Sequence, residues 1–192
     1  MSHTILVAWG QTDWEAQGRL TGDLDLSLSA AGEAQVGRDA SELLVFGPAQ
    51  VFSGPEEAAR RTAAVIARGL HVRPRRHKDL HEIDLGHWEG LTPEHFEDRY
   101  PSVWRQWQDD PTSVNPPEGE PLVEAAARLG RALARIVRKA GDENAIIVTG
   151  PLAMHVLWLI VEGRPLATLW ERTAKARRWI ALERPAPPAT PA

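Results

Sequence analysis

Three short apolar segments, each followed by a glycine-containing turn and a helix-forming stretch, constrain the fold of this 192-residue chain most. A short apolar run bounded by turn residues is typical of a buried strand. Strands that alternate with helices favour a mostly parallel sheet with helices on both faces. The segments are residues 4–8, 50–52 and 145–148, and the turns after them contain Gly10, Gly54 and Gly150.

The rest of the chain fits the same α/β plan. Ser29 and Thr92 are suitable N-caps, and Pro93 follows Thr92 at the first helical position. We expect one domain over residues 1–183, a three-layer α/β/α sandwich, and a disordered Pro/Ala-rich tail over 184–192. The predicted helices cover 30–44, 56–69, 122–140 and 152–162, with a helical insertion over 92–100 and 102–107; Val72 and residues 179–182 are further strand candidates.

Composition argues against several classes of function. The chain has no cysteine, which excludes disulfides, thiolate catalysis and cysteine-type zinc sites. Its formal net charge of −4 argues against a nucleic-acid surface, which usually needs a clustered basic excess. The apolar run 152–161 is about half the length needed to span a bilayer, and no signal pattern opens the chain. We expect a cytoplasmic protein with no cofactor, no metal, and no nucleic-acid or membrane partner.

Motifs spread over residues 4–182 resemble one known family. The motifs are Gly10-Gln11-Thr12 with Gly18-Arg19-Leu20, Ser53-Gly54-Pro55, Leu80-His81-Glu82-Ile83-Asp84-Leu85-Gly86, Pro116-Pro117-Glu118-Gly119-Glu120, and Val148-Thr149-Gly150. Together they resemble the histidine phosphatase superfamily, also called phosphoglycerate mutase-like. The resemblance implies that family's α/β sandwich with a helical insertion over the pocket. In such sheets the ligand crevice lies beyond the carboxyl ends of the strands.

The resemblance also implies that the family's chemistry is missing here. Its phosphate pocket uses an Arg and a nucleophilic His at the first strand end, an Asn in the next loop, an Arg on the second-motif helix and a second His after the late strand. Trp9 stands at the position of the nucleophilic His. An indole nitrogen carries a hydrogen and no available lone pair, so Trp9 cannot attack phosphorus. Only the acid–base position keeps its carboxylate, as Glu82. The five matching positions hold Ala8, Trp9, Glu15, Ala58 and Gly150.

These substitutions predict a pocket that no longer attracts anions. Each lost charge-assisted hydrogen bond is worth about 1.5–3 kcal/mol. If Glu15 and Glu82 lie about 4 Å apart, they repel by roughly 4 kcal/mol at an effective dielectric of about 20. We expect no catalytic residue. The predicted pocket consists of Ala8, Trp9, Gly10, Gln11, Thr12, Glu15, Ala58, Arg61, Glu82 and Gly150.

Several groups near these positions have two interpretations. Arg60 and Arg61, one turn after Ala58, either restore positive charge or lie on the surface. His155, one turn beyond Gly150, either swings toward the pocket or is structural. The helix start at Gly150-Pro151 leaves backbone amides that can bind an anion weakly. His81 and His87 flank the Glu82 loop without matching a family nucleophile.

Three further clusters have a plainer interpretation beside the functional one. The basic run Arg73, Arg75, Arg76 and Lys78 either holds a phosphate-bearing partner or is a solvated face. Trp104 and Trp107 either belong to the core or form an exposed aromatic patch. The residues His77, His81, Glu82, Asp84 and His87 are metal-ligand types, but their loop-like segment favours a solvated loop.

The sequence therefore predicts a pseudoenzyme, without phosphatase or mutase activity, that binds a small ligand stacked on Trp9 or a protein partner. One alternative is a phosphomonoesterase or other hydrolase rewired around Glu82 and Glu15, because paired carboxylates can divide acid and base roles when their pKa values differ. A carboxylate buried beside Trp9, with the other hydrated, would favour it. The other alternative is an assembly role, as a homodimer through Trp104 and Trp107.

Overall fold

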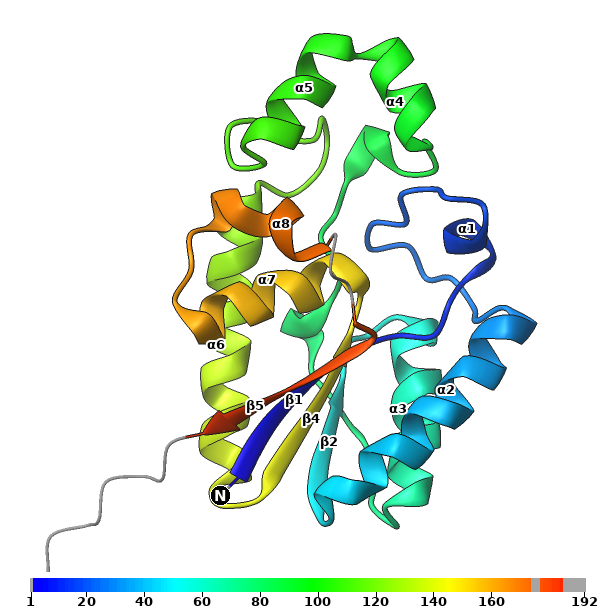
Figure 1. The fold of residues 1–192 in the computed structure, drawn as a ribbon, viewed down its shortest axis with the longest axis vertical. Coiled ribbons are helices and arrows are strands. Elements are labelled where there is room, and N and C mark those ends of the chain that lie inside the picture. The colour runs from blue at the N-terminus through cyan, green and yellow to red at the C-terminus, as the bar shows by residue number, and fades with distance from the viewer. Residues whose placement is uncertain (1, 174–176, 185–192) are drawn as a thin grey trace, which may run out of the picture.

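A five-stranded sheet in the order β3-β2-β4-β1-β5 forms the centre of the protein (Figure 1). The structure is a computed structural model that describes residues 2–173 and 177–184. Strands β1 (Ser2–Ala8), β2 (Ala49–Ser53), β3 (Arg75–Arg76) and β4 (Asn144–Thr149) run parallel, and β5 (Trp179–Arg184) pairs antiparallel with β1. The expected mostly parallel α/β sheet is confirmed.

Each face of the sheet has its own apolar core, because successive strand residues point to opposite sides. Ile5 and Val7 pack with α2 (Ala30–Leu43) and α3 (Glu57–Gly69). Leu6 and Ala8 pack with α6 (Leu122–Ala140) and α7 (Pro151–Glu162) on the other face. The two helix pairs enclose the sheet as the outer layers of a sandwich (Figure 1).

The remaining α-helices lie beyond the carboxyl ends of the parallel strands, in the upper half of Figure 1. These helices are α1 (Asp13–Ala16), α4 (Pro93–Arg99), α5 (Pro101–Asp109) and α8 (Leu169–Thr173). Elsewhere along the described chain, short 3-10 turns cover Leu44–Phe46, Lys78–Leu80, Gly86–Trp88 and Leu166–Thr168. None of the described helices is both long and apolar enough to cross a membrane.

Aromatic side chains attach the insertion α4–α5 to the rest of the molecule. The ring centroid of Phe96 lies 4.7 Å from that of Trp88, 5.3 Å from Trp104 and 5.5 Å from Trp107. Trp107 is buried, and Trp104 is half-buried against the same cluster. Of the two interpretations of this tryptophan pair, the structure supports the core.

Some expected boundaries differ from the observed ones. Val72 does not start a strand: its N–H donates to the Ala67 carbonyl at 3.0 Å and completes the end of α3, so pairing with β2 begins only at Arg75. The loop expected between Gly10 and Ser29 contains the short helix α1, capped by Thr12. Arg184 belongs to β5 and not to the tail, and the rest of the expected tail lies outside the described residues.

Close packing at Gly32 yields a stability prediction. A Cβ on Gly32 would lie 2.1 Å from the Gln11 carbonyl oxygen, in the loop that leads to α1, so Gly32→Ala should lower the free energy of unfolding by about 1–3 kcal/mol. Gly37, in the same helix, has open space around it, so Gly37→Ala should raise the free energy of unfolding by about 0.5–1 kcal/mol. Urea denaturation of both variants checks this; equal effects would contradict the packing argument.

Candidate functional site

A cavity of about 310 Å³ with a mainly apolar wall lies beyond the carboxyl ends of the strands. Its wall is built from segments far apart in the sequence, which only the fold brings together. The lining residues are Glu15, Arg19, Leu20, Thr21 and Gly22 from α1 and the loop after it, Glu82 and Leu85 from the loop after β3, Trp107 from α5, Pro151, Leu152 and His155 from α7, and Trp170 from α8.

Trp9 is not part of this wall. The side chain is 1% exposed and packs in the same core cluster as Ala58, on the α2–α3 face of the sheet. Its backbone N–H donates to the Thr149 carbonyl at 3.0 Å, and its indole Nε1 donates to Glu15 Oε1 at 3.3 Å. A ligand therefore cannot stack on Trp9, which fills space in the protein interior.

Glu82 occupies the space next to Gly150, where the resemblance implies the family's second histidine. A Cβ on Gly150 would lie 2.2 Å from Glu82 Oε2 and 2.8 Å from Glu82 Cβ. The absence of a side chain at Gly150 is therefore what allows the carboxyl group of Glu82 to reach the start of α7. The two positions fit each other, and a histidine at residue 150 could not share this space with Glu82 in its present position.

The carboxyl group of Glu82 also takes up the donors at the start of α7. Leu152 N–H donates to Oε2 at 2.8 Å and Ala153 N–H to Oε1 at 2.7 Å. Pro151 has no N–H, and Met154 N–H donates to the Gly150 carbonyl. Glu82 therefore accepts the N–H groups of Leu152 and Ala153, the donors that the expected weak anion site at this helix start would use.

Burial raises the pKa of the carboxyl groups at and near the cavity. Burial, with a smaller contribution from the nearby Glu56, raises the pKa of Glu82 to about 8, although hydrogen bonds from three backbone N–H groups oppose the shift. Burial likewise raises the pKa of Glu15, against hydrogen bonds from Thr12 and Trp9. Glu56 is buried, accepts the Glu82 N–H at 2.7 Å, and its Oε2 has no partner among the described residues.

Arg128 holds the Glu82 loop in place. Its guanidinium pairs with Glu120 at 2.6 Å and donates to the backbone carbonyls of Asp79, His81 and Glu82. Arg128 is not among the site residues predicted from the sequence. A signal was present, because this arginine lies on the otherwise apolar face of α6.

The expected pocket residues divide into three groups. Glu15 and Glu82 line the cavity, and Gly150 lies directly behind Glu82. Arg61 is exposed and pairs with Glu33 at 2.8 Å, so it adds no charge to the cavity. The others lie outside the cavity wall and build the core or the turn after β1: Ala8, Trp9, Gly10, Gln11, Thr12 and Ala58.

The histidines and the basic run also separate. His155 lines the cavity, whereas His81 lies outside its wall, with Nδ1 2.8 Å from the Glu82 carbonyl, and His87 is exposed. The basic run lies elsewhere: Arg75 and Arg76 border a second hollow of about 370 Å³ together with Arg135, Arg138 and Lys139. The wall residues that sequence reasoning did not connect with the pocket are Arg19, Leu20, Thr21, Gly22, Leu85, Trp107, Leu152 and Trp170.

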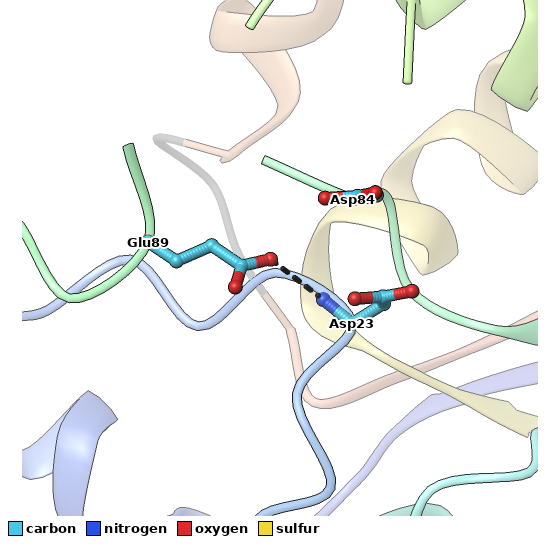
Figure 2. A group of neighbouring side chains, drawn as sticks. All are labelled: Asp23, Asp84 and Glu89. Atoms are coloured by element: carbon cyan, nitrogen blue, oxygen red, sulfur yellow. Dashed lines mark hydrogen bonds between the residues drawn. The ribbon is translucent and has the colours of Figure 1, made fainter. Parts of the chain in front are cut away.

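Three acidic side chains outside the cavity wall lie close together (Figure 2). One oxygen from each of Asp23, Asp84 and Glu89 falls within 4.8 Å of the others. Backbone contacts explain their positions: Glu89 Oε1 accepts the Asp23 N–H at 3.3 Å, and Asp84 Oδ1 accepts the Gly86 N–H at 2.8 Å. Burial and mutual repulsion raise the pKa of Asp23 and of Glu89. Acidic residues alone do not define a metal site, and we assign none here.

The raised pKa of Glu82 predicts how stability depends on pH. The unfolded chain releases this proton near pH 4.5 and the folded chain only near pH 8, so stability should fall as the pH rises between these values, by roughly 4–5 kcal/mol in all. Glu82→Gln should remove this component of the slope, and the exposed control Glu97→Gln should keep it. Urea denaturation from about pH 5 to 9 measures it; an unchanged slope in Glu82→Gln would contradict the assignment.

Comparisons with known proteins agree with the architecture. The family model of the histidine phosphatase superfamily (branch 1) matches residues 4–185. The chain is 27% identical over 170 residues to phosphoserine phosphatase 1 of Hydrogenobacter thermophilus, covering 88% of this chain and 81% of the relative. It is 29% identical over 164 residues to the uncharacterized phosphatase PhoE of Bacillus subtilis, covering 85% of this chain and 79% of the relative.

A solved structure extends the comparison to the fold. The structure of a mycobacterial glucosyl-3-phosphoglycerate phosphatase matches 95% of this chain and 91% of its own, with a TM-score of 0.83 at 24% identity, and so shares the fold. The family match over nearly the whole chain and the common sheet confirm the resemblance drawn from the motifs. This chain belongs to the histidine phosphatase superfamily, branch 1.

Proposed function

We propose that this protein is a histidine-phosphatase-like pseudoenzyme that lacks phosphatase and mutase activity and binds a small molecule in the cavity beneath α5. One observation carries the proposal: the carboxyl group of Glu82 takes up the space beside Gly150 and accepts the N–H groups of Leu152 and Ala153. A phosphoryl group would have to displace this internal carboxyl before reaching the start of α7.

The chemistry of the surrounding groups supports the same conclusion. Trp9 is buried and its indole is a donor only, so the position of the family's nucleophile supplies none for a phosphohistidine route. Deleting the nucleophile of a well-studied protease lowers the rate by about 10⁶-fold. A general acid such as Glu82 supplies only about 10²–10⁴-fold, and only to a reaction that other groups already promote.

The two alternatives have weaker support. For a rewired hydrolase, Glu15 is a half-buried carboxyl beside Trp9, but Glu82 is buried too, and both of its oxygens already accept backbone N–H groups. The carboxyl beside Trp9 is thus the half-buried one and Glu82 the buried one, the reverse of the asymmetry that would favour the hydrolase. For assembly through Trp104 and Trp107, the buried position of Trp107 leaves no broad exposed aromatic patch.

The direct test is hydrolysis of phosphomonoesters. We expect the purified chain to hydrolyse para-nitrophenyl phosphate and phosphoserine no faster than the Glu82→Gln variant, because both have Trp9 at the position of the family's nucleophile. Intact-mass spectrometry after acid quenching should detect no phosphorylated protein. An active phosphatase of the same superfamily serves as positive control. Turnover comparable to that control, abolished by Glu82→Gln, would reject the proposal.

A double-mutant cycle tests whether Glu82 and Gly150 fit each other as described. Gly150→Ala should lower the free energy of unfolding by about 1–3 kcal/mol, because the new Cβ meets the Glu82 side chain. In the Glu82→Ala background, Gly150→Ala should lower the free energy of unfolding by less than it does in the wild-type protein. Gly130→Ala is the control, since a Cβ there makes only an ordinary contact with Ile160 at 3.9 Å. Additive effects of the two substitutions would mean that the positions are independent.

A further inference from the structure

The hollow of about 370 Å³ bordered by the edge strand β3 and by α6 is strongly basic. Five cationic side chains line this basic hollow, Arg75 and Arg76 from β3 and Arg135, Arg138 and Lys139 from α6. All five are exposed. The basic hollow shares no lining residue with the cavity beneath α5, so it is a second and separate candidate site.

The positive charge of the basic hollow is largely uncompensated. Within the described chain no acidic residue lines it, although the whole chain has 26 acidic and 22 basic residues. Arg135 pairs with Asp79 at 3.1 Å, and the other four cations have no ion pair among the described residues. Arg75 Nη1 donates to Gln50 Oε1 at 2.8 Å, and this neutral partner orients the guanidinium without cancelling its charge.

The helix dipole explains only part of this cluster. Arg138 and Lys139 lie in the last turn of α6, where the negative end of the dipole favours cations. Arg75 and Arg76 belong to a different element, and they bring two more positive charges to the same hollow. Like charges gathered around one hollow repel each other, and a bound anion would replace this repulsion with attraction.

The floor of the basic hollow strengthens the attraction for an anion. Phe52 is 2% exposed and Ile136 is 1% exposed, and these two buried apolar side chains lie between the cations of the two elements in the lining. A depression with charges of one sign and apolar, low-dielectric walls focuses the electric field and concentrates ions of the opposite sign. The basic hollow combines these two features.

We propose that the basic hollow binds a small anion with a chain of phosphate groups, whose oxygens accept hydrogen bonds from Arg75, Arg76 and Arg138. The planar guanidinium group matches phosphate oxygens with two parallel N–H donors. A phosphate chain also concentrates more charge in a small volume than a chain of carboxylates does. The volume lies within the range of small-molecule sites, and β3, with two residues, is too short to pair with an added peptide strand.

Calorimetric titration of the unmodified protein tests the class of ligand. At low ionic strength, tripolyphosphate should bind at least about 10-fold more tightly than inorganic phosphate, because several charge-assisted hydrogen bonds form at once. It should also bind more tightly than hexaglutamate, and added salt should weaken it. ATP distinguishes two sources of the chain: equal affinity for ATP and tripolyphosphate identifies the inorganic chain as sufficient, and tighter binding of ATP identifies a nucleotide.

A matched pair of variants locates the site. Arg138→Gln should weaken tripolyphosphate binding by about 3- to 10-fold, between the effects of an exposed ion pair and of a charge-assisted hydrogen bond. Arg68→Gln is the control, because Arg68 is also exposed, lies in the last turn of α3 and has no ion pair among the described residues. It should keep the wild-type affinity. The double variant Arg76→Glu/Arg138→Glu should lose binding, and thermal denaturation checks that each variant folds.

His77 provides a second measurement at the same place. Burial lowers its pKa, Asp79 opposes the shift, and the nearby Arg135, Lys139 and Lys78 lower the pKa further. A bound polyanion favours the protonated imidazole, so saturating tripolyphosphate should raise the pKa of His77. Proton NMR of the imidazole signals measures it, with His77→Gln identifying the signal.

Several results would overturn the proposal. They are equal affinities for phosphate and tripolyphosphate, binding of hexaglutamate as tight as that of tripolyphosphate, and equal losses in Arg138→Gln and Arg68→Gln. An equal rise in the pKa of His77 and of His95, which is exposed on α4, would also contradict it, because it would indicate binding without a fixed site. None of these results depends on the cavity beneath α5, so they leave the proposed function untouched.

Discussion

The contact between the Glu82 carboxyl and the first turn of α7 organises the site. It joins the loop after β3 to the β4–α7 turn through the Leu152 and Ala153 N–H groups, and it depends on the missing side chain at Gly150. Arg128 secures the same loop from α6. An internal carboxyl therefore stands where a helix N-terminus is otherwise open to an external anion. Its burial is costly for the ionised form, which is why the pKa of Glu82 rises to about 8.

Trp9 and Glu82 together determine where the open volume of the cavity lies. Trp9 fills the interior behind Glu15, so the volume that remains lies against the tryptophans of α5 and α8 and against His155. The sheet, the helix pairs and the insertion keep the superfamily architecture. Apolar burial in the two core layers stabilises that architecture whether or not the groups at the strand ends bind a phosphoryl group.

Sequence reasoning succeeded where a local rule was sufficient. The alternation of apolar segments, glycine turns and helical stretches predicted the parallel sheet, and the motifs predicted the family, because both are properties of short segments. The same reasoning placed Trp9 and Arg61 in the pocket on position alone. The structure instead buries Trp9 and turns Arg61 toward Glu33, since side-chain direction depends on which neighbouring groups complete the contact.

By itself the sequence determined the order of the elements and the residue types at the five positions matching the family's chemistry, since both depend only on local pattern and on side-chain identity. Only the tertiary structure decided which groups meet. Glu82 and Gly150 are brought together across the fold, and the cavity wall unites α1, α5, α7 and α8. The physical reason is that steric fit and hydrogen bonding act over a few ångströms in space, between residues whose separation along the chain carries no record of that proximity.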